Sequence, residues 1–169
     1  MVIILLADGF EEVEALAPLD IMLRANIPVK TASIGEALVK GAHGIKVEAD
    51  MLAGDIIEDE IEMLVLPGGM PGTTNLDQSA FTERFIAAAI KNGGHIAAIC
   101  AAPSILGKRG LLRGKEAICF PGFESSLDGA TICSDRSVVT SGSFTTARDF
   151  RAAYSFGDEL TEIYLRRKD

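Results

Sequence analysis

The chain has 169 residues, of which 48% are hydrophobic and 24% charged, and its formal net charge is −8 at pH 7. This length is typical of one domain with a substantial core, and the apolar share excludes a disordered chain. The acidic balance disfavours nucleic acid and anionic membranes as partners, because both are negatively charged. We therefore expect a single domain over residues 1–169 that binds neither.

The three cysteines, Cys100, Cys119 and Cys133, indicate a reducing compartment. An odd, widely spaced set in a sequence without a recognisable signal peptide is typical of reduced thiols in a cytoplasmic protein. No Cys-x-x-Cys pair or His-Cys cluster is present, so we expect no metal site. The apolar residues 1–7 are too few to cross a bilayer and predict a buried strand instead.

The first part of the chain alternates between strand-like and helix-like patterns. Residues 2–7 form a continuous apolar run, which is typical of a strand covered on both faces. Apolar residues at helical spacing over 13–24 predict an amphipathic helix, and residues 29–34 predict a second strand. A less regular stretch follows, with a small hairpin expected around Val39 and residues 45–47.

The same alternation continues through the middle of the chain. Residues 63–67 predict a third buried strand, which runs into a glycine-rich loop at 68–72. A helix is expected over 79–91, where Asn92-Gly93-Gly94 would end it. Residues 95–99 predict a fourth strand, and a further helix opens at 103–108.

The last part predicts shorter strands over 117–120, 130–133 and 137–140, with a C-terminal helix after Thr145. The alternation as a whole predicts an α/β fold: a doubly wound, mostly parallel sheet with helices on both faces. Functional sites of such sheets form outside the carboxyl ends of the strands. We expect the turn at 8–14, the glycine-rich loop and the Cys100 turn to converge there.

Cys100 is the strongest candidate for chemistry. It follows an apolar strand and precedes small residues, an arrangement that predicts a sharp, strained strand-to-helix turn of the nucleophile-elbow type. The helix N-terminus behind it is expected to lower the thiol pKa, and backbone N–H groups of Ala101, Gly68 and Gly69 could bind an oxyanion. Most buried free cysteines are inert core residues, but the position at the carboxyl end of a strand favours a functional one.

Three carboxylates, Glu11, Glu12 and Glu14, lie at the start of the first predicted helix. Acidic residues stabilise a helix N-terminus by about 0.3–1 kcal/mol each, which accounts for two of the three. Glu14 stands among apolar residues, so we expect it to turn inward. A buried carboxyl group has a raised pKa and can donate a hydrogen bond to a thiolate or move a proton.

Histidine is scarce. Only His43 and His95 are present, and His95 lies on the same strand as Cys100, about 16 Å away at roughly 3.3 Å per residue. It cannot be the partner of Cys100, and His43 is expected in an exposed loop. A Cys-His mechanism needs an imidazole within about 3 Å of the sulfur, so the sequence argues against a peptidase or amidotransferase.

Three motifs resemble the ThiJ/PfpI superfamily, most closely a bacterial-type member of its Parkinson-disease-protein (DJ-one) branch. They are Gly-Phe-Glu-Glu-Val-Glu at 9–14, Leu-Pro-Gly-Gly at 66–69 and Ala-Ala-Ile-Cys-Ala-Ala-Pro at 97–103. The resemblance covers most of the chain and implies a flavodoxin-like fold and a homodimer.

The resemblance also implies roles for individual residues. Cys100 would be the nucleophile and oxidation-sensitive thiol, and Glu14 its protonated partner. Gly69 and Ala101 would supply backbone donors. The pocket would include Gly68 and Phe120, and Arg24 would lie near the dimer interface.

Two departures from the family pattern concern this region. Many members carry a histidine twenty residues after the cysteine, where this chain has Phe120. The family's Ser-Arg-Gly-Pro-Gly-Thr stretch corresponds here to residues 141–146, Ser-Gly-Ser-Phe-Thr-Thr, and we expect this loop near the site and the dimer contact.

Two functions fit these residues. The first is an enzyme without cofactor that acts on small 2-oxoaldehydes, as glyoxalase-like or deglycase-like relatives do, through attack by Cys100 and proton transfer by Glu14. The second is an oxidative-stress sensor or protective protein in which an oxidant converts Cys100 to sulfenic and then sulfinic acid. The same groups serve both functions, so the sequence leaves both open.

Overall fold

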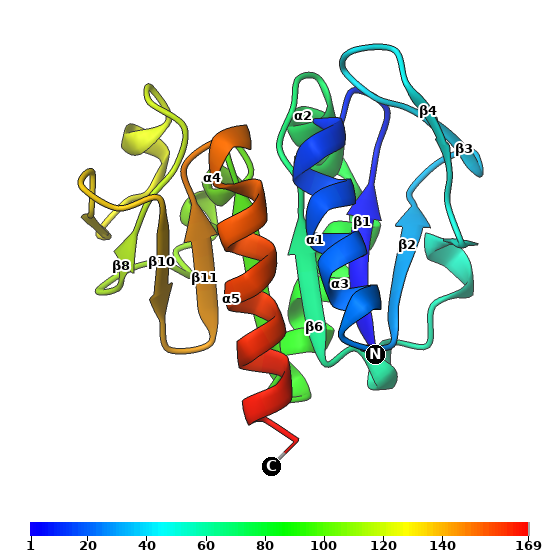
Figure 1. Cartoon of the computed structure of the whole chain (residues 1–169). Helices are drawn as coiled ribbons and strands as arrows, with labels where there is room; N and C mark the ends of the chain where they lie inside the picture. Colours follow the sequence, from blue (N-terminus) through cyan, green and yellow to red (C-terminus); the bar gives the residue numbers. More distant parts are fainter. Residues whose placement is uncertain (169) are drawn as a thin grey trace.

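The computed structural model describes residues 1–168 and places a seven-stranded sheet between two layers of helices (Figure 1). In spatial order the strands are β10 (Val138–Ser141), β11 (Phe144–Ala147), β7 (His95–Ile99), β6 (Met63–Leu66), β1 (Val2–Leu6), β2 (Val29–Ser33) and β5 (Met51–Leu52). All neighbouring pairs are parallel except β10 and β11. The predicted α/β fold of flavodoxin-like type is confirmed.

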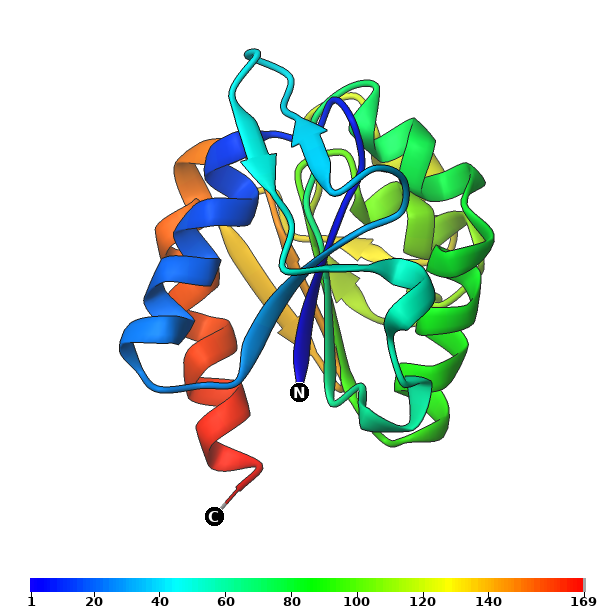
Figure 2. The ribbon, with the colours of Figure 1, turned by 90° about the vertical axis from the view of Figure 1, so that its right-hand side faces the viewer.

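The helices cover both faces of this sheet (Figure 2). One face carries α1 (Glu12–Arg24) and α5 (Ala153–Arg166), and the other carries α2 (Gly72–Gln78), α3 (Ala80–Lys91) and α4 (Pro103–Lys108). Across residues 1–168, no helix has both the length and the apolar character needed to cross a membrane.

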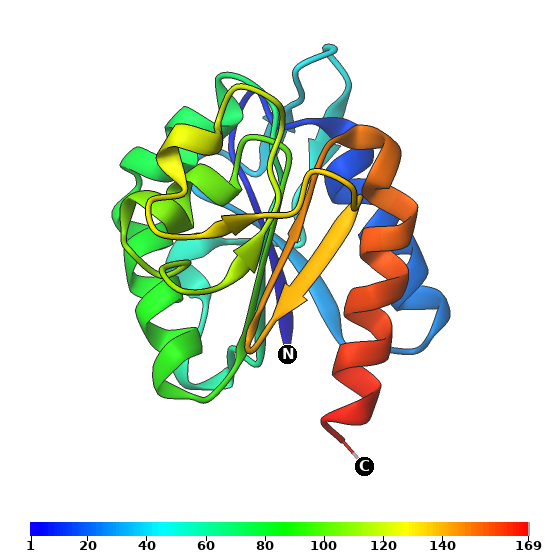
Figure 3. The same cartoon turned by 90° about the vertical axis from the view of Figure 1, so that its left-hand side faces the viewer.

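Two small sheets lie outside this core. The hairpin of β3 (Leu38–Lys40) and β4 (Lys46–Glu48) stands above the carboxyl ends of the central strands. A short parallel pair, β8 (Glu116–Ala117) and β9 (Thr131–Ile132), lies beside β10 (Figure 3). The hairpin was predicted from the sequence.

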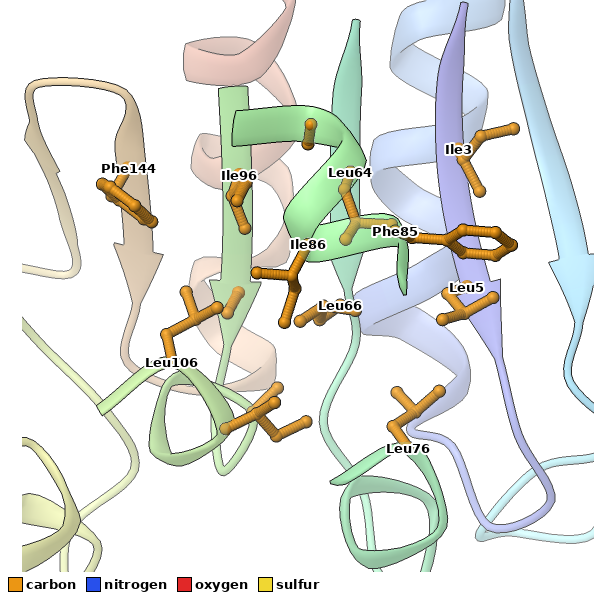
Figure 4. Close-up of a cluster of buried hydrophobic side chains, with 14 of the residues drawn as sticks. Ile3, Leu5, Leu64, Leu66, Leu76, Phe85, Ile86, Ile96, Leu106 and Phe144 are labelled. Atoms are coloured by element: carbon orange, nitrogen blue, oxygen red, sulfur yellow. The ribbon is translucent and has the colours of Figure 1, made fainter. Parts of the chain in front are cut away.

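Alternation along the buried strands divides the core in two. On β1, Ile3 and Leu5 pack with Phe85 of α3 (Figure 4), while Val2, Ile4 and Leu6 face α1 and α5. Each fully buried Leu or Phe side chain contributes about 1.5–3 kcal/mol, whereas an exposed ion pair contributes roughly 0–1 kcal/mol. The two apolar layers therefore hold the sheet and helices together, and they fix where each strand ends.

Three short elements, α2, β5 and β11, were not predicted from the sequence. The helix predicted over 79–91 is α3, with the Ser79 side chain accepting a hydrogen bond from the Phe81 N–H as its cap, but α2 before it was not predicted. β5 and β11 were also missed, and the C-terminal helix predicted after Thr145 begins at Ala153. The missed elements have two to seven residues, which is too short for a hydrophobic period to identify them.

Candidate active site

Cys100 occupies the sharp turn that the sequence predicts after β7. Its φ angle is +65°, in the left-handed region that costs a residue with a side chain about 1–2 kcal/mol. The Cys100 N–H donates to the Ala147 carbonyl over 2.9 Å, and the Cys100 carbonyl accepts from the Phe120 N–H over 2.7 Å. Hydrogen bonds on both sides thus hold the strained residue in place at the carboxyl end of the sheet.

Glu14 lies beside this turn, in the first turn of α1, and is completely buried. Its Oε2 atom accepts a hydrogen bond from the Gly68 N–H over 2.9 Å, and the Cys100 thiol lies within hydrogen-bonding reach of the carboxyl group. Within residues 1–168, Oε1 is buried without a hydrogen-bond partner. The carboxyl group turns inward as the sequence predicts, and its free oxygen suits a protonated acid.

Burial raises the pKa of Glu14 to about 7, with smaller contributions from the charges of Glu11 and Asp149. Burial also raises the pKa of the Cys100 thiol to about 12, and the charge of Glu14 adds to this shift. The backbone N–H groups of Ala101 and Gly69 oppose the shift by hydrogen bonding to the sulfur. Two negative charges side by side in a buried pocket are costly, so the pair retains one proton over a wide pH range.

The expectation of a lowered thiol pKa is therefore wrong. It rested on the helix behind Cys100, but α4 has only six residues and gives a weak dipole. Desolvation and the neighbouring carboxylate outweigh it.

Two glycines allow the loop after β6 to touch both reactive groups. A Cβ atom at Gly68 would lie 2.6 Å from Cys100 Cβ and 2.6 Å from Glu14 Oε2, so a side chain cannot be accommodated without movement. Gly69 has φ = +90°, and a Cβ atom there would lie 2.3 Å from the Glu11 nitrogen. The Leu-Pro-Gly-Gly motif therefore has a steric function at this site.

Phe120 lies next to the Cys100 turn, whereas Arg24 lies far from it. Phe120 joins the Cys100 turn through its backbone, and its side chain is 40% exposed. Arg24 is exposed at the other end of α1, about 15 Å along the helix from Glu14, and pairs with Asp20 over 2.8 Å. Its proposed role at a dimer interface stays a prediction.

The remaining cysteines form no disulfide with Cys100, and His95 lies at the other end of β7. All three cysteines are free, and both Cys119 and Cys133 are buried. His95 begins β7 at the amino end of the sheet, where Nε2 hydrogen-bonds to Thr145 Oγ1 over 2.9 Å. The prediction that His95 is not the partner of Cys100 is confirmed.

Residues 141–146 do not lie where the sequence analysis expected them. β11 pairs with β7 in parallel, with Phe144 opposite Ile96, so the turn at 142–143 lies at the amino end of the sheet. Cys100 is at the carboxyl end. This expectation was wrong because β11 was not predicted: β10 runs antiparallel to β11, so the turn between them lies at the amino end of the sheet.

The segment beside the Cys100 turn is instead the one that follows Ala147. It contains Arg148 and Asp149, and the Asp149 charge acts on Glu14. The sequence analysis missed both residues. The apolar and threonine run at 144–147, read as a buried strand, is the signal that would have located them.

His43 is exposed, as predicted, but it contacts the acidic start of α1. Its Nδ1 atom lies 2.9 Å from Glu12 Oε2 and 3.4 Å from Glu11 Oε1. The ligand atoms of these three residues lie within 4.8 Å of one another, close enough to share a metal ion. The Glu12 carboxylate already has protein donors on both oxygens, so these contacts do not by themselves indicate a cation.

The site as a whole has a sulfur nucleophile, a carboxyl group that titrates near neutrality and two backbone N–H donors aimed at the sulfur. Such a set can attack an electrophilic carbon, stabilise the resulting oxyanion and move a proton.

Known proteins resemble this chain in sequence. The model of the DJ-1/PfpI family matches residues 1–163. The protein dj-1beta of Drosophila melanogaster is 32% identical over 163 residues, covering 95% of this chain and 87% of that protein. A deglycase of Pyrococcus abyssi is 32% identical over 164 residues, with coverage of 96% and 98%. Two Arabidopsis thaliana DJ-1 homologues are matched over only 39% and 42% of their length.

Solved structures agree with the sequence relatives. The crystal structure of Drosophila melanogaster DJ-1beta has a TM-score of 0.90 at 31% identity, covering 95% of this chain and 88% of that one. A DJ-1 superfamily protein of Salmonella typhimurium, crystallised as a cysteine-to-alanine variant, has a TM-score of 0.89 at 30% identity, with coverage of 97% and 89%. On the evidence of sequence, fold and the Cys100 turn, the chain belongs to the DJ-1/PfpI family.

Proposed function

We propose that the protein is an enzyme without cofactor that uses Cys100 to act on small 2-oxoaldehydes, in the manner of a glyoxalase or deglycase. Several archaeal relatives at about 30% identity are named deglycases, which supports this class. The observation that carries the proposal is the buried Glu14 carboxyl group beside the Cys100 thiol, with a pKa raised to about 7. A group that both gives and accepts a proton near neutral pH is what such chemistry requires.

The first step is addition to the aldehyde. The Cys100 sulfur bonds to the aldehyde carbon of methylglyoxal, and the thiol proton passes through Glu14 to the aldehyde oxygen, giving a hemithioacetal. The N–H groups of Gly69 and Ala101, which reach the sulfur, are placed to stabilise charge on that oxygen. No electrons leave the substrate in this step.

The second step is isomerisation. Glu14 as carboxylate removes the proton from the former aldehyde carbon and gives it to the ketone oxygen, leaving an enediol. It then takes the hydroxyl proton of the sulfur-bearing carbon and delivers it to the neighbouring carbon. The product is a lactoyl thioester on Cys100, which water hydrolyses to lactate while the thiol is restored. Glu14 is the single acid–base group of this scheme, because the chain has Phe120 where many relatives have histidine. We therefore expect slow turnover.

Oxidation of Cys100 is the second candidate function. The Glu14 Oε1 atom is buried without a partner among the described residues, and a proton there could bridge to a sulfinate oxygen. This would make the protein a stress sensor with an oxidant rather than an aldehyde as its small-molecule partner. A cytoplasmic homodimer, with Arg24 on its dimer side, is part of either proposal.

The test is lactate formation from methylglyoxal by the wild type, by Cys100→Ser and by Cys133→Ser as a matched thiol control, all purified in the same way. Lactate that requires Cys100 and not Cys133 supports the enzyme. If no lactate forms but mild peroxide adds two oxygens at Cys100 alone, as mass spectrometry would show, the sensor is supported instead. Equal lactate formation by the wild type and Cys100→Ser contradicts the enzymatic proposal.

A further inference from the structure

Glu12 has surroundings that a helix-stabilising surface acid would not have. Its side chain is only 8% exposed. Oε1 accepts hydrogen bonds from the His43 N–H over 2.8 Å and the Ile45 N–H over 3.3 Å, and Oε2 accepts from His43 Nδ1 over 2.9 Å. A charged acceptor with several donors forms stronger bonds than neutral groups do, so this carboxylate binds the turn between β3 and β4 firmly.

The turn is shaped to receive this carboxylate. A Cβ atom at Gly41 would lie 2.2 Å from Glu12 Oε1, so the backbone at Gly41 packs directly on the acid. The contact leaves no space for water between them. Burial of a carboxylate is costly unless it is fully hydrogen-bonded, and here the turn supplies the bonds.

Backbone hydrogen bonds extend this attachment along the loop between β1 and α1. The Gly9 N–H donates to the Lys40 carbonyl over 2.7 Å, the Ala42 N–H donates to the Phe10 carbonyl over 2.8 Å, and the Lys40 N–H donates to Asp8 Oδ1 over 2.8 Å. Residues 40–45 are thus joined to residues 8–12 at several points.

The other side of the same loop is joined to the glycine-rich loop. The Glu11 N–H donates to the Gly68 carbonyl over 2.9 Å, and the Gly72 N–H donates to the Gly9 carbonyl over 3.1 Å. Glu14 follows Glu12 by two residues and accepts from the Gly68 N–H. The loop before α1 and the first turn of α1, which carries Glu14, therefore lie between the β3–β4 turn and the Gly68 loop, with hydrogen bonds to both.

We propose that Glu12 is a positioning residue: its buried carboxylate holds the β3–β4 turn against the start of α1 and thereby keeps Glu14 beside Cys100. Without this anchor the first turn of α1 is free to shift, and Glu14 moves away from the thiol. Besides burial, the charges of Glu11 and Asp149 act on Glu14 and raise its pKa, whereas hydrogen bonds from Cys100 and the Gly68 N–H lower it. The turnover measurement in the test below rests on the proposed function, whereas the measurement of Cys100 alkylation does not.

The experiment compares Glu12→Ala, Glu12→Asp and Glu12→Gln with the wild type. The first readout is the rate at which iodoacetamide alkylates Cys100. The reaction is run at pH values from 5 to 9 and the rate is measured by mass spectrometry. In the wild type this rate changes near pH 7, as Glu14 titrates. In Glu12→Ala we expect that change to move toward pH 4.5, the value of an exposed carboxyl group, and kcat to fall about tenfold or more with KM little changed.

Two further variants separate positioning from general stability. Glu12→Gln keeps an acceptor for both backbone N–H groups, and we expect it to stay within about threefold of the wild type. Glu62→Gln is the matched control, because Glu62 is another anchoring acid: it binds Tyr164 Oη over 3.0 Å and lies before β6, at the amino end of the sheet. It should lower the unfolding midpoint without changing the pH profile of Cys100. If Glu12→Ala does not fold, Glu12→Asp, which withdraws the carboxylate by one methylene, takes its place.

The outcomes are distinguishable. A pH profile and kcat that are unchanged in both Glu12→Ala and Glu12→Asp overturn the inference, even when the wild type makes lactate. A shifted Cys100 profile in a protein that makes no lactate supports the inference and contradicts the proposed function. A Glu62→Gln variant that shifts the profile as much as Glu12→Ala would show a general loss of stability and also overturns the inference.

Discussion

Gly68 lies in the loop after β6 and Cys100 in the turn after β7, yet a Cβ atom on Gly68 would lie 2.6 Å from Cys100 Cβ. Real Cβ atoms do not approach this closely, so the two loops touch through the hydrogen atoms of a glycine. The Glu14 Oε2 atom would lie 2.6 Å from the same Cβ position. The thiol and the carboxyl group can therefore lie this close only because residue 68 is a glycine.

Replacing Gly68 with alanine should separate the reactive pair. The added methyl group must displace Cys100 or Glu14, and overpacking of this kind costs about 1–3 kcal/mol. We expect a lower free energy of unfolding in urea and at least a tenfold loss of Cys100-dependent turnover. Gly35→Ala is the control, because nothing lies within 4 Å of a Cβ atom there. Equal effects of the two substitutions would show that the contact at Gly68 is unimportant.

Glu14 should make the protein less stable as the pH rises. Its pKa is about 7 in the folded state and near 4.5 when exposed, so folding takes up a proton between these values. The contribution is fully present below pH 4.5 and is lost as the pH rises through 7, a change on the order of 3 kcal/mol. Urea unfolding at pH 5 and pH 8 measures it, and the Glu14→Gln variant should lack this part of the difference.

His95 has the opposite effect, which is why the Glu14 contribution is read from the variant. Burial lowers the pKa of His95 to about 4, so its contribution to stability is present above pH 6.5 and is lost as the pH falls through 4. In Glu14→Gln, the free energy of unfolding should therefore increase with pH between pH 5 and 6.5. A Glu14→Gln curve that runs parallel to the wild type over pH 5–8 would contradict the assigned Glu14 pKa.

The Glu14→Gln substitution should also make the Cys100 thiol more reactive toward alkylation, while it lowers turnover. Removing the carboxylate removes a negative charge that raises the Cys100 pKa. We expect iodoacetamide to alkylate Cys100 at pH 8 about tenfold faster, because a greater fraction is thiolate. Turnover should fall, because the amide cannot transfer the proton. Glu36→Gln, at an exposed carboxylate, serves as the control, and slower alkylation in Glu14→Gln would contradict the coupling.

Cys100→Gly should be more stable than Cys100→Ala. The φ angle of +65° costs nothing for glycine, whereas cysteine is strained by about 1–2 kcal/mol. We expect Cys100→Gly to unfold at a higher urea concentration than Cys100→Ala, although it is the smaller residue and more flexible when unfolded. The opposite order would mean that the turn is not strained.

Most of the sheet was predictable because its strands are buried on both faces. The runs at 2–6, 63–66 and 96–99 are continuous and apolar, and the turn after each contains glycine or a small residue. That pattern also placed Cys100 and Glu14 at the same end of the sheet. The steric demands of the site are visible in the sequence as glycines.

The electrostatics and the β10–β11 region were not predictable in the same way. The thiol pKa depends on how deeply Glu14 and Cys100 are buried together, which no local pattern states. The placement of residues 141–146 depends on which of two short threonine-containing segments joins β7. The role of Glu12 depends on contacts with a turn about thirty residues away, so its sequence neighbours suggested only a helix-stabilising charge.

The peptide groups around Cys100 have a consequence for hydrogen exchange. The Cys100 amide is bonded to Ala147 and the Phe120 amide is bonded to the Cys100 carbonyl, in the middle of the sheet's carboxyl edge. The Cys100 amide cannot exchange with deuterium unless β7 separates from the end of β11, so it should be among the slowest in the chain. The nucleophile therefore sits in a rigid frame, and any adjustment to a substrate must come from rotation of the thiol itself.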